Sequence, residues 1–397
     1  MIQITSPRER TLGPLTLVLG IIAWVMLILG SFGIALVILG VGFIFYLFIQ
    51  SALIAHIKGN GVELSEQQFP DLYSQFISCC EQLKIKTPPQ AYILNGNGGL
   101  NAFATKFLGT QYVVLMTDVV DAMDKHEDGV SFYIGHELGH LRMNHLSGGL
   151  LRWPVLWLPL LGAAYSRSRE TTCDRHGLAC CKSPEGAARS LAALSAGEKR
   201  WENLDIAAYV KQAKHSSGFW MSFHELTAGY PWLTRRAAHV VDIEKMLPKR
   251  NFLSYIFAAF VPFTGRLGSG FGLLMLVYII GVLAAVAVPA YKQYEVRAEL
   301  SAAIIESQNA RNSLGNYYVN NQMIPESLAT LNIQAELPSG SWMTLNDGMV
   351  LSVISDNGEL IFTPAEGEQG EIIWDCINGD GLKQKQLPPS CTRVEVK

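Results

Sequence analysis

The sequence predicts an α+β protein in which a mainly helical domain with a small edge-stranded sheet is combined with membrane helices and a second, small α+β domain. Three observations predict this class. Long apolar runs without charged residues lie near the N-terminus and again in the last third of the chain. A helical apolar pattern around residues 130–143 follows a strand-like segment at 112–115. The C-terminal region is rich in turn residues and carries two cysteines near its end.

Composition places the chain in a membrane. Charged residues make up 16% and hydrophobic residues 49% of the 397 residues, and the mean hydropathy is +0.20. These are few charges for a soluble protein of this length. The net charge of −3 shows no basic excess, so nucleic acid is not expected as a partner.

The first apolar run covers residues 11–57 and contains no Asp, Glu, Lys or Arg. Because one membrane span needs about 20 residues, this run predicts two spans, with a turn at residues 30–33. It is too long for a cleaved signal peptide. A second uncharged run, residues 267–291, lies between Arg266 and Lys292 and predicts one further span.

A His-Glu-Leu-Gly-His motif begins at His136. Residues four apart lie on one face of a helix, so His136 and His140 can hold one metal ion. Glu170 lies thirty residues after His140 and can complete a set of three ligands, which leaves a fourth position open for water, as a catalytic zinc site requires. Glu137 lies beside the metal and can act as the general base.

Glu170 and Asp174 are also four residues apart. On a helix, Asp174 can accept a hydrogen bond from the distal ring nitrogen of a metal-binding histidine and fix its tautomer. The alternative for Asp174 is a solvated helix carboxylate. Structural or surface roles are expected for most other histidines, namely His126, His145, His176, His215, His224 and His239.

A short apolar stretch, residues 150–165, lies between His140 and Glu170 and contains two prolines. A single membrane crossing here would put the candidate ligands on opposite sides of the bilayer. The stretch is therefore expected to dip in and return, to lie on the surface, or to pack within the protein. Trp153 and Trp157 suit an interfacial position.

The motif, together with its flanking residues, resembles the membrane zinc proteases of the HtpX and CAAX-prenyl-protease type over residues 65–245. The resemblance rests on HELGH, on the strand-like segment at 112–115, and on Asn101-Ala102-Phe103-Ala104, Arg169-Glu170 and Cys173-Asp174-Arg175. It implies a zincin-type domain with one Zn²⁺ per chain, which hydrolyses peptide bonds by zinc-activated water. The implied zinc ligands are His136, His140 and Glu170, with Glu137 as the base and Asn101 and Ala102 on an edge strand that holds the substrate.

The same family carries a His-Pro pair with an arginine five residues after the proline. Here the pair is Tyr230-Pro231, followed by Arg236, and the resemblance implies catalytic roles for Tyr230 and Arg236. A phenol can donate a hydrogen bond to an oxyanion but carries no positive charge at neutral pH. The alternatives are a packed aromatic at position 230 and a structural ion pair for Arg236.

Residues 268–397 resemble type IV pilins and pseudopilins. An apolar helix follows Gly270, an amphipathic helical pattern covers residues 294–318, and Cys376 and Cys391 bracket the C-terminus. The resemblance implies a transmembrane helix, a small α+β domain and a Cys376–Cys391 disulfide. Pilins carry a glutamate five residues into the mature helix, where this chain has Met275. The alternative is a plain membrane anchor with a small α+β domain.

Counting spans predicts the topology. Arg8 and Arg10 keep the N-terminus inside by the positive-inside rule. Two spans return the chain to the cytoplasm, where the zinc domain is expected, and the third span places the tail in the periplasm of a bacterial inner membrane. The five other cysteines then lie in a reducing compartment, and the tail pair lies where disulfides form. The expected parts are 1–58, 59–250, 251–267 and 268–397, namely a transmembrane hairpin, a metallopeptidase domain, a linker or interfacial segment, and a helix with a pilin-like domain.

The function that these observations predict is a membrane-bound zinc endopeptidase for quality control or processing of membrane proteins. Expected partners are membrane-associated protein or peptide substrates, the lipid bilayer, and pilus or secretion-system components. One alternative is an inactive or weak protease-like scaffold that binds membrane or pilus-assembly proteins. Another is a minor pilin subunit with a protease-derived head.

Overall fold

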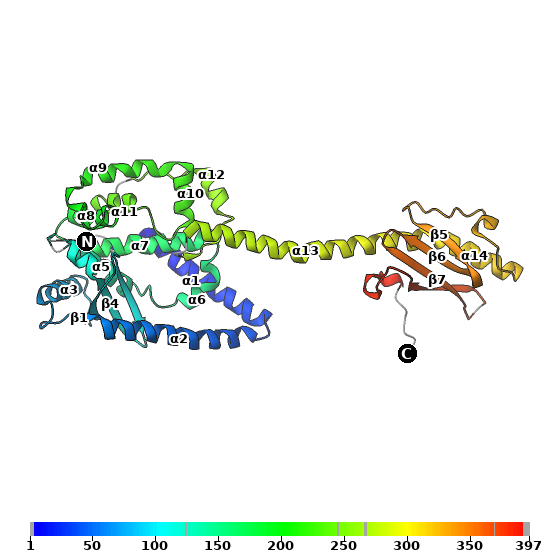
Figure 1. The fold of residues 1–397 in the computed structure, drawn as a ribbon, viewed down its shortest axis with the longest axis horizontal. Coiled ribbons are helices and arrows are strands. Elements are labelled where there is room, and N and C mark those ends of the chain that lie inside the picture. The colour runs from blue at the N-terminus through cyan, green and yellow to red at the C-terminus, as the bar shows by residue number, and fades with distance from the viewer. Residues whose placement is uncertain are drawn as a thin grey trace. The chain divides into compact units, whose positions relative to one another are not determined.

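Two units make up the protein, Met1–Val277 and Tyr278–Lys397, and each carries a small four-stranded sheet among many helices (Figure 1). This computed structural model describes residues 4–391 except 100, 124, 127, 244, 245, 266, 267 and 369. The mainly helical character expected from the sequence is therefore present, together with two sheets. The four-part division of the chain stays a prediction.

The N-terminal apolar run forms two helices, α1 (Pro7–Gly30) and α2 (Ile34–Asn60). The turn lies where the sequence predicts it, and Gly33 supplies its left-handed conformation with φ 84°. A third apolar stretch, Gly270–Asn321, is also long and apolar enough to cross a membrane. It comprises α13 (Gly268–Glu306) and α14 (Gln308–Asn321). Leu267, the expected start of that span, and Arg266 before it lie outside the described residues.

The first sheet has the strand order β1-β2-β4-β3, so β3 lies at an edge. Strands β2 and β4 run parallel, whereas β3 and β4 are antiparallel. The strands are β1 (Val62–Glu63), β2 (Gln90–Leu94), β3 (Ala102–Phe107) and β4 (Thr110–Met116).

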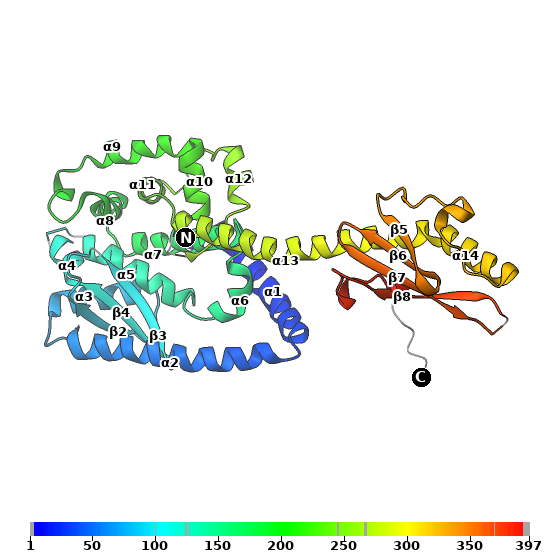
Figure 2. The ribbon, with the colours of Figure 1, turned by 45° about the vertical axis from the view of Figure 1, so that its right-hand side comes forward.

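Both faces of this sheet are covered because the side chains of β4 alternate between two cores. Val113 and Leu115 belong to the core that includes Leu138 of the motif helix. Val114, in contrast, belongs to the core that includes Ile57, near the end of α2. The C-terminal turns of α2 thus pack against the sheet. Figure 2 shows α2 running along the sheet.

The remaining helices of the first unit build the site and its surroundings. They are α3 (Pro70–Gln82), α4 (Thr117–Met123), α5 (Gly129–Arg142), α6 (Gly149–Leu156), α7 (Leu161–Ala179), α8 (Pro184–Ala196), α9 (Ile206–Lys211), α10 (Phe219–Thr227), α11 (Leu233–Val241) and α12 (Phe252–Ala258).

The apolar stretch at 150–165 is partly packed and partly exposed, with Trp153 61% and Trp157 49% exposed, so which of its three expected arrangements it adopts stays a prediction. It forms α6 and the start of α7, and α6 lies against α1. The indole of Trp24 donates a hydrogen bond to the Leu150 carbonyl at 2.8 Å and stacks on Trp153 with centroids 6.0 Å apart. The candidate ligands on either side of this segment in the sequence therefore lie in the same unit.

The second unit combines the end of α13, α14 and an antiparallel sheet in the order β5-β6-β7-β8. The strands are β5 (Trp342–Asn346), β6 (Val350–Ser355), β7 (Gly358–Glu366) and β8 (Ile372–Asn378). Helix residues Leu300 and Leu314 share a core with Leu351 and Phe362 of the sheet. Cys376 and Cys391 form the expected disulfide, and residues 392–397 lie outside the description.

Candidate metal centre and active-site cleft

Helix α5 is buried on nearly every side, and it carries the motif histidines into the interior. Ile134 and Leu138 hold it in the main core. On its other face it lies directly against α7, and small residues allow this approach. A Cβ placed on Gly139 would lie 3.0 Å from the Cβ of His176. Gly135 and Gly139 lack a Cβ and therefore allow α5 to pack closely on α7. This close packing turns the motif histidines toward α7.

Helix α7 places Glu170 between the two histidines. Glu170 Oε2 lies 3.4 Å from His136 Nε2, and Oε1 lies 3.8 Å from His140 Nε2. All three side chains are largely buried. Asp174, one turn further along, lies on the opposite side of the first ring, with its Oδ1 3.0 Å from His136 Nδ1.

The spacing of these atoms suits a tetrahedral metal ion. Zinc bonds to nitrogen and oxygen of about 2.1 Å at tetrahedral angles separate two ligand atoms by roughly 3.4 Å. The observed separations from Glu170 are 3.4 and 3.8 Å. With Asp174 accepting the Nδ1 proton of His136, the neutral form of that ring has its lone pair at Nε2, facing Glu170. The donor set therefore fits a divalent cation.

The charges of the same groups also favour a bound cation. Burial alone would lower the pKa of His136, but its hydrogen bonds with Asp174 and Glu170 outweigh burial and raise the pKa to about 10. Burial alone would raise the pKa of Glu170, but His136, His140 and Arg236 lower it to about 2. The site thus holds a positive charge between ionised carboxylates, and a bound cation would replace the proton there.

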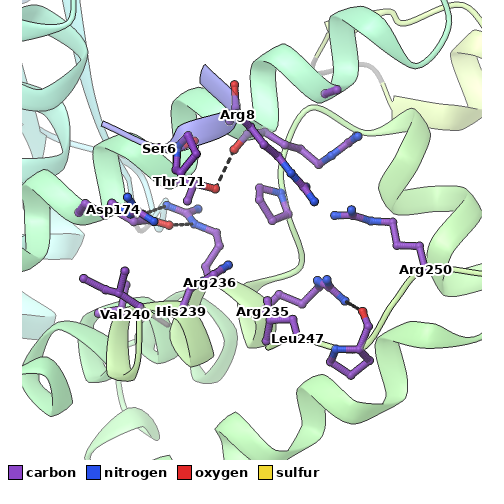
Figure 3. Close-up of a pocket in the computed structure, with 18 of the residues that line it drawn as sticks. Ser6, Arg8, Thr171, Asp174, Arg235, Arg236, His239, Val240, Leu247 and Arg250 are labelled. Carbon is purple, nitrogen blue, oxygen red and sulfur yellow. Dashed lines mark hydrogen bonds and ion pairs between the residues drawn. The ribbon is translucent and has the colours of Figure 1, made fainter. Parts of the chain in front are cut away.

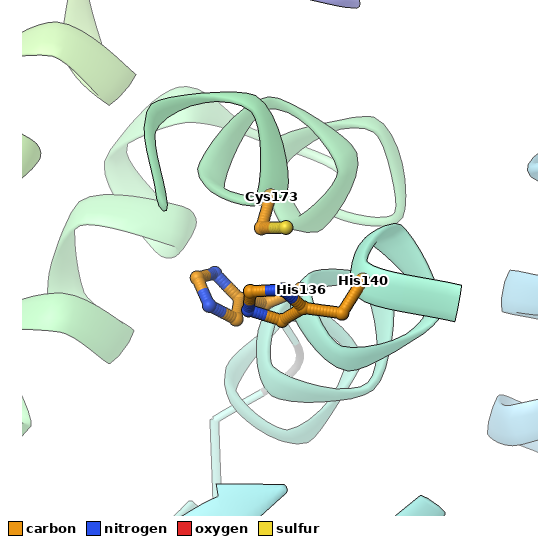
Figure 4. A group of neighbouring side chains, drawn as sticks. All are labelled: His136, His140 and Cys173. Carbon is orange, nitrogen blue, oxygen red and sulfur yellow. The ribbon is translucent and has the colours of Figure 1, made fainter. Parts of the chain in front are cut away.

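Cys173 offers a competing ligand atom, because its Sγ and nitrogen atoms of His136 and His140 all lie within 4.8 Å of one another (Figure 4). In the metal-free protein, burial raises the pKa of this thiol well above its usual value, and thiolate is the metal-binding form. Its Sγ also lies 3.6 Å from His145 Nδ1. Glu170, which the sequence predicts as the third donor, faces both Nε2 atoms.

A hydrogen-bonded chain that the sequence reasoning missed reaches the other histidine. His140 Nδ1 lies 3.0 Å from His145 Nδ1, and His145 Nε2 lies 2.6 Å from Oε1 of Glu9, in the first turn of α1. Burial lowers the pKa of His145, so the ring is neutral. If its proton is on Nε2, toward Glu9, then its Nδ1 accepts the proton of His140 Nδ1, and the lone pair of His140 is left at Nε2.

Contacts with α7 hold the start of α1 beside the hydrogen-bonded residues His140 and His145. The Ser6 amide donates to Thr172 Oγ1 on α7 at 3.0 Å, and Ser6 also caps α1. Glu9 is buried. The sequence carried one signal, since Glu9 is an acidic residue just before an apolar run. Only the fold shows that Glu9 contacts His145, which is 136 positions away in the sequence.

The candidate metal ligands line a cleft of about 290 Å³. Its lining includes all the proposed site residues of this unit except Asp174, namely Asn101, Ala102, His136, Glu137, His140, Glu170, Tyr230 and Arg236. Ala102 is the first residue of β3, the edge strand, which packs beside α5. The candidate catalytic and metal-binding side chains therefore form one wall of the cleft, and the edge strand β3 forms another.

Arg236 is buried and clamps Asp174. Its Nε donates to Asp174 Oδ2 at 2.9 Å and its Nη2 to Oδ1 at 2.6 Å, while Glu170 Oε2 lies 3.9 Å away. This arginine therefore forms the ion pair that the sequence left open as an alternative, and its direct role in catalysis stays a prediction. Tyr230 is 38% exposed and lines the same cleft.

Two histidines one helical turn apart on α5, an ionised carboxylate from α7 and a glutamate within the motif define the site as one of metallopeptidase type. Comparison with known proteins agrees. Residues 66–161 match the model of Peptidase family M48, a metallopeptidase family. The match includes both motif histidines and ends before Glu170, so Glu170 as the third donor stays a prediction.

The chain is also similar to pilins. It is 29% identical to the type IV major pilin protein PilE1 of Neisseria gonorrhoeae, over 30% of this chain and 88% of that protein. It is 23% identical to a fimbrial protein of Neisseria meningitidis serogroup A, over 30% of this chain and 89% of that protein. Fimbrial protein EcpC of Eikenella corrodens is 29% identical over 30% of this chain and 85% of its own length. The chain thus combines a region of the M48 metallopeptidase type with a type IV pilin-like region.

Proposed function

We propose that the protein is a membrane-bound zinc endopeptidase that cleaves protein or peptide substrates at the cleft beside β3. The observation that carries this proposal is the position of Glu170, which faces the Nε2 atoms of His136 and His140 at 3.4 and 3.8 Å. Glu137 lies in the same cleft and is buried. A purely structural metal site would need no such acid beside an open cavity.

Each side chain has a role in this proposal. Zinc, when bound by His136, His140 and Glu170, would supply a Lewis acid and lower the pKa of water. Glu137 accepts the proton of the attacking water and later passes it to the leaving amine. Asp174, held in place by Arg236, keeps His136 in the tautomer that presents Nε2.

The substrate is expected to bind as an added strand. Among the residues that the structure describes, strand β3 pairs only with β4, so its other edge can pair with an extended peptide. Asn101 and Ala102 lie at the start of this strand, in the cleft. Tyr230 lies at the cleft surface, where its hydroxyl can donate a hydrogen bond to a developing oxyanion.

The proposed location is a bacterial inner membrane, with a cytoplasmic first unit and a periplasmic second unit. The three long apolar helices and the arginines at positions 8 and 10 support this topology. The disulfide in the second unit and the free cysteines in the first agree with it. A phosphatase reporter fused after Arg250 and the same reporter fused after Lys397 should report opposite compartments, and the same compartment from both would contradict this topology.

The test of the activity compares wild-type protein with Glu137→Gln and with the surface control Glu66→Gln, all purified in mild detergent. We expect close to one zinc per chain in all three proteins. Casein cleavage should fall about 10²–10⁴-fold in Glu137→Gln only, the range expected when a general base is lost. Equal cleavage by Glu137→Gln would contradict the proposal. Zinc binding without any cleavage by the wild type would favour the scaffold alternative, which rests on tyrosine at position 230.

A further inference from the structure

A second and larger cavity lies behind the metal centre. Its volume is about 660 Å³, and it is bounded by the start of α1, by α7, by α11 and by the segment that leads into α12. Asp174 and Arg236 form part of its wall, and Arg236 also lines the substrate cleft. None of the proposed metal ligands lines this second cavity.

The lining of this cavity is strongly basic. Figure 3 shows the guanidinium groups of Arg8, Arg235 and Arg250 turned toward the same space. Seven cationic side chains line it in all, namely Arg8, Arg167, Arg175, Arg235, Arg236, Lys249 and Arg250, against one lining carboxylate among the described residues, Asp174.

The nearby carboxylates do not balance this charge. Asp174 forms an ion pair with Arg236. Glu225, which lies behind the lining, serves both Arg235 at 3.3 Å and Arg250 at 2.6 Å. Positive charge therefore exceeds negative charge among the described side chains around the cavity.

A buried arginine adds to this excess. Arg167 is buried and donates hydrogen bonds to three neutral backbone carbonyls, those of residues 225, 226 and 228. Burial, followed by the nearby charge of Arg250, lowers its pKa to about 9, so it remains charged at neutral pH. Like charges held together in this way favour an anionic ligand.

The position of the cavity indicates where such a ligand comes from. Arg8 is in the first turn of α1, the apolar helix, and Tyr255 is in α12. Helix α12 exposes large apolar side chains, with Phe252 75% and Phe257 56% exposed. A basic pocket flanked by apolar helix surface at the end of a membrane helix matches the requirements of a lipid head group.

We propose that this cavity binds a phosphate group, and that its source is the head group of an anionic membrane phospholipid. Arginine forks suit the oxygens of a phosphodiester, and the apolar surfaces of α1 and α12 would contact the acyl chains. This site is separate from the proposed peptidase activity and does not depend on it.

The test measures lipid binding to the full chain in maltoside micelles, by native mass spectrometry with increasing phosphatidylglycerol or phosphatidylcholine. The variant is Arg8→Gln with Lys249→Gln, because both side chains are exposed and neither lies in the substrate cleft. The matched control is Lys199→Gln with Arg200→Gln, two exposed cations outside both cavities. A further variant, Lys249→Gln alone, leaves the N-terminal arginines unchanged.

We expect wild type and control to bind phosphatidylglycerol in preference to phosphatidylcholine. The double variant should bind it about 30-fold more weakly, because each Lys or Arg near an anionic lipid contributes on the order of fivefold. Lys249→Gln alone should show about a fivefold loss. Equal binding by the double variant and its control, in proteins with the same circular dichroism and zinc content, would overturn the proposal.

A separate arm identifies the source of the phosphate. If inorganic phosphate raises the thermal unfolding midpoint of the wild type but not of the double variant, and phosphatidylglycerol does not bind, the site is retained with a soluble phosphate compound as its ligand. If neither probe distinguishes the double variant from its control, the cavity is not a phosphate site.

Discussion

Glu9 Oε1 and His145 Nε2 lie 2.6 Å apart, which joins the first turn of an apolar helix to the candidate metal centre. His145 in turn lies 3.0 Å from His140. We therefore expect the first turn of helix α1 to help fix the tautomer of His140, a candidate metal ligand. Partners of this kind around metal ligands typically affect metal affinity by 10–100-fold.

The first prediction concerns this contact. Glu9→Gln should raise the metal dissociation constant about tenfold, because a neutral amide holds the Nε2 proton of His145 less firmly than a carboxylate does. The measurement is competition with a chelating dye in detergent. Glu66→Gln, on the surface, should leave the constant unchanged. Equal affinities for the two variants would show that Glu9 does not position the site.

The second prediction separates the two candidate third ligands. Glu170→Ala should lose most of the bound metal, because two histidines alone hold the ion weakly. Cys173→Ala should keep it, because the Glu170 carboxylate, and not the thiol, faces the Nε2 atoms of both histidines. Elemental analysis after mild purification decides between them. Metal lost from Cys173→Ala and retained by Glu170→Ala would reverse the assignment.

The third prediction concerns pH in the metal-stripped protein. Because the folded state raises the pKa of His136 from 6.5 to about 10, the stabilisation is complete below pH 6.5 and is lost as the pH rises toward 10. Within that window the free energy of unfolding should fall by about 1.4 kcal/mol per pH unit from this group. Thermal unfolding midpoints of wild type should therefore decline across the window.

The matched variants for this experiment are His136→Gln and His215→Gln. The first should flatten the decline in the unfolding midpoint between pH 6.5 and about 10. The second changes an exposed histidine outside the site and should leave the decline as it is in the wild type. An unchanged decline in His136→Gln would assign the pH dependence to another group.

The fourth prediction concerns the second unit. The Cys376–Cys391 disulfide closes a sequence separation of 15 residues, and a cross-link of this size typically contributes about 3 kcal/mol. Cys391→Ser should make this unit sensitive to limited proteolysis while the metal content stays the same. Cys181→Ser, a free cysteine of the first unit, is the control. Equal sensitivity of the two variants would show that the disulfide is not needed for this fold.

The sequence by itself determined the elements that depend on local periodicity. The absence of charge over residues 11–57 indicated two apolar helices and the turn at Gly33, because span length and turn chemistry are local properties. The spacing of His136 and His140 placed both rings on one face of a helix for the same reason. The resemblance of the motif and its flanking residues to a protease family also predicted Glu170 as the third ligand.

Only the tertiary structure decided which distant side chains complete the site. Glu9 reaches His145 across 136 positions, and Arg236 reaches Asp174 across 62. The basic cavity likewise gathers Arg8, Arg167 and Arg250 from two helices and the segment before α12. No local pattern encodes such contacts, because they depend on how helices pack against one another. The packing of α1 on α7 thus places Glu9, in the first turn of an apolar helix, beside the candidate metal centre.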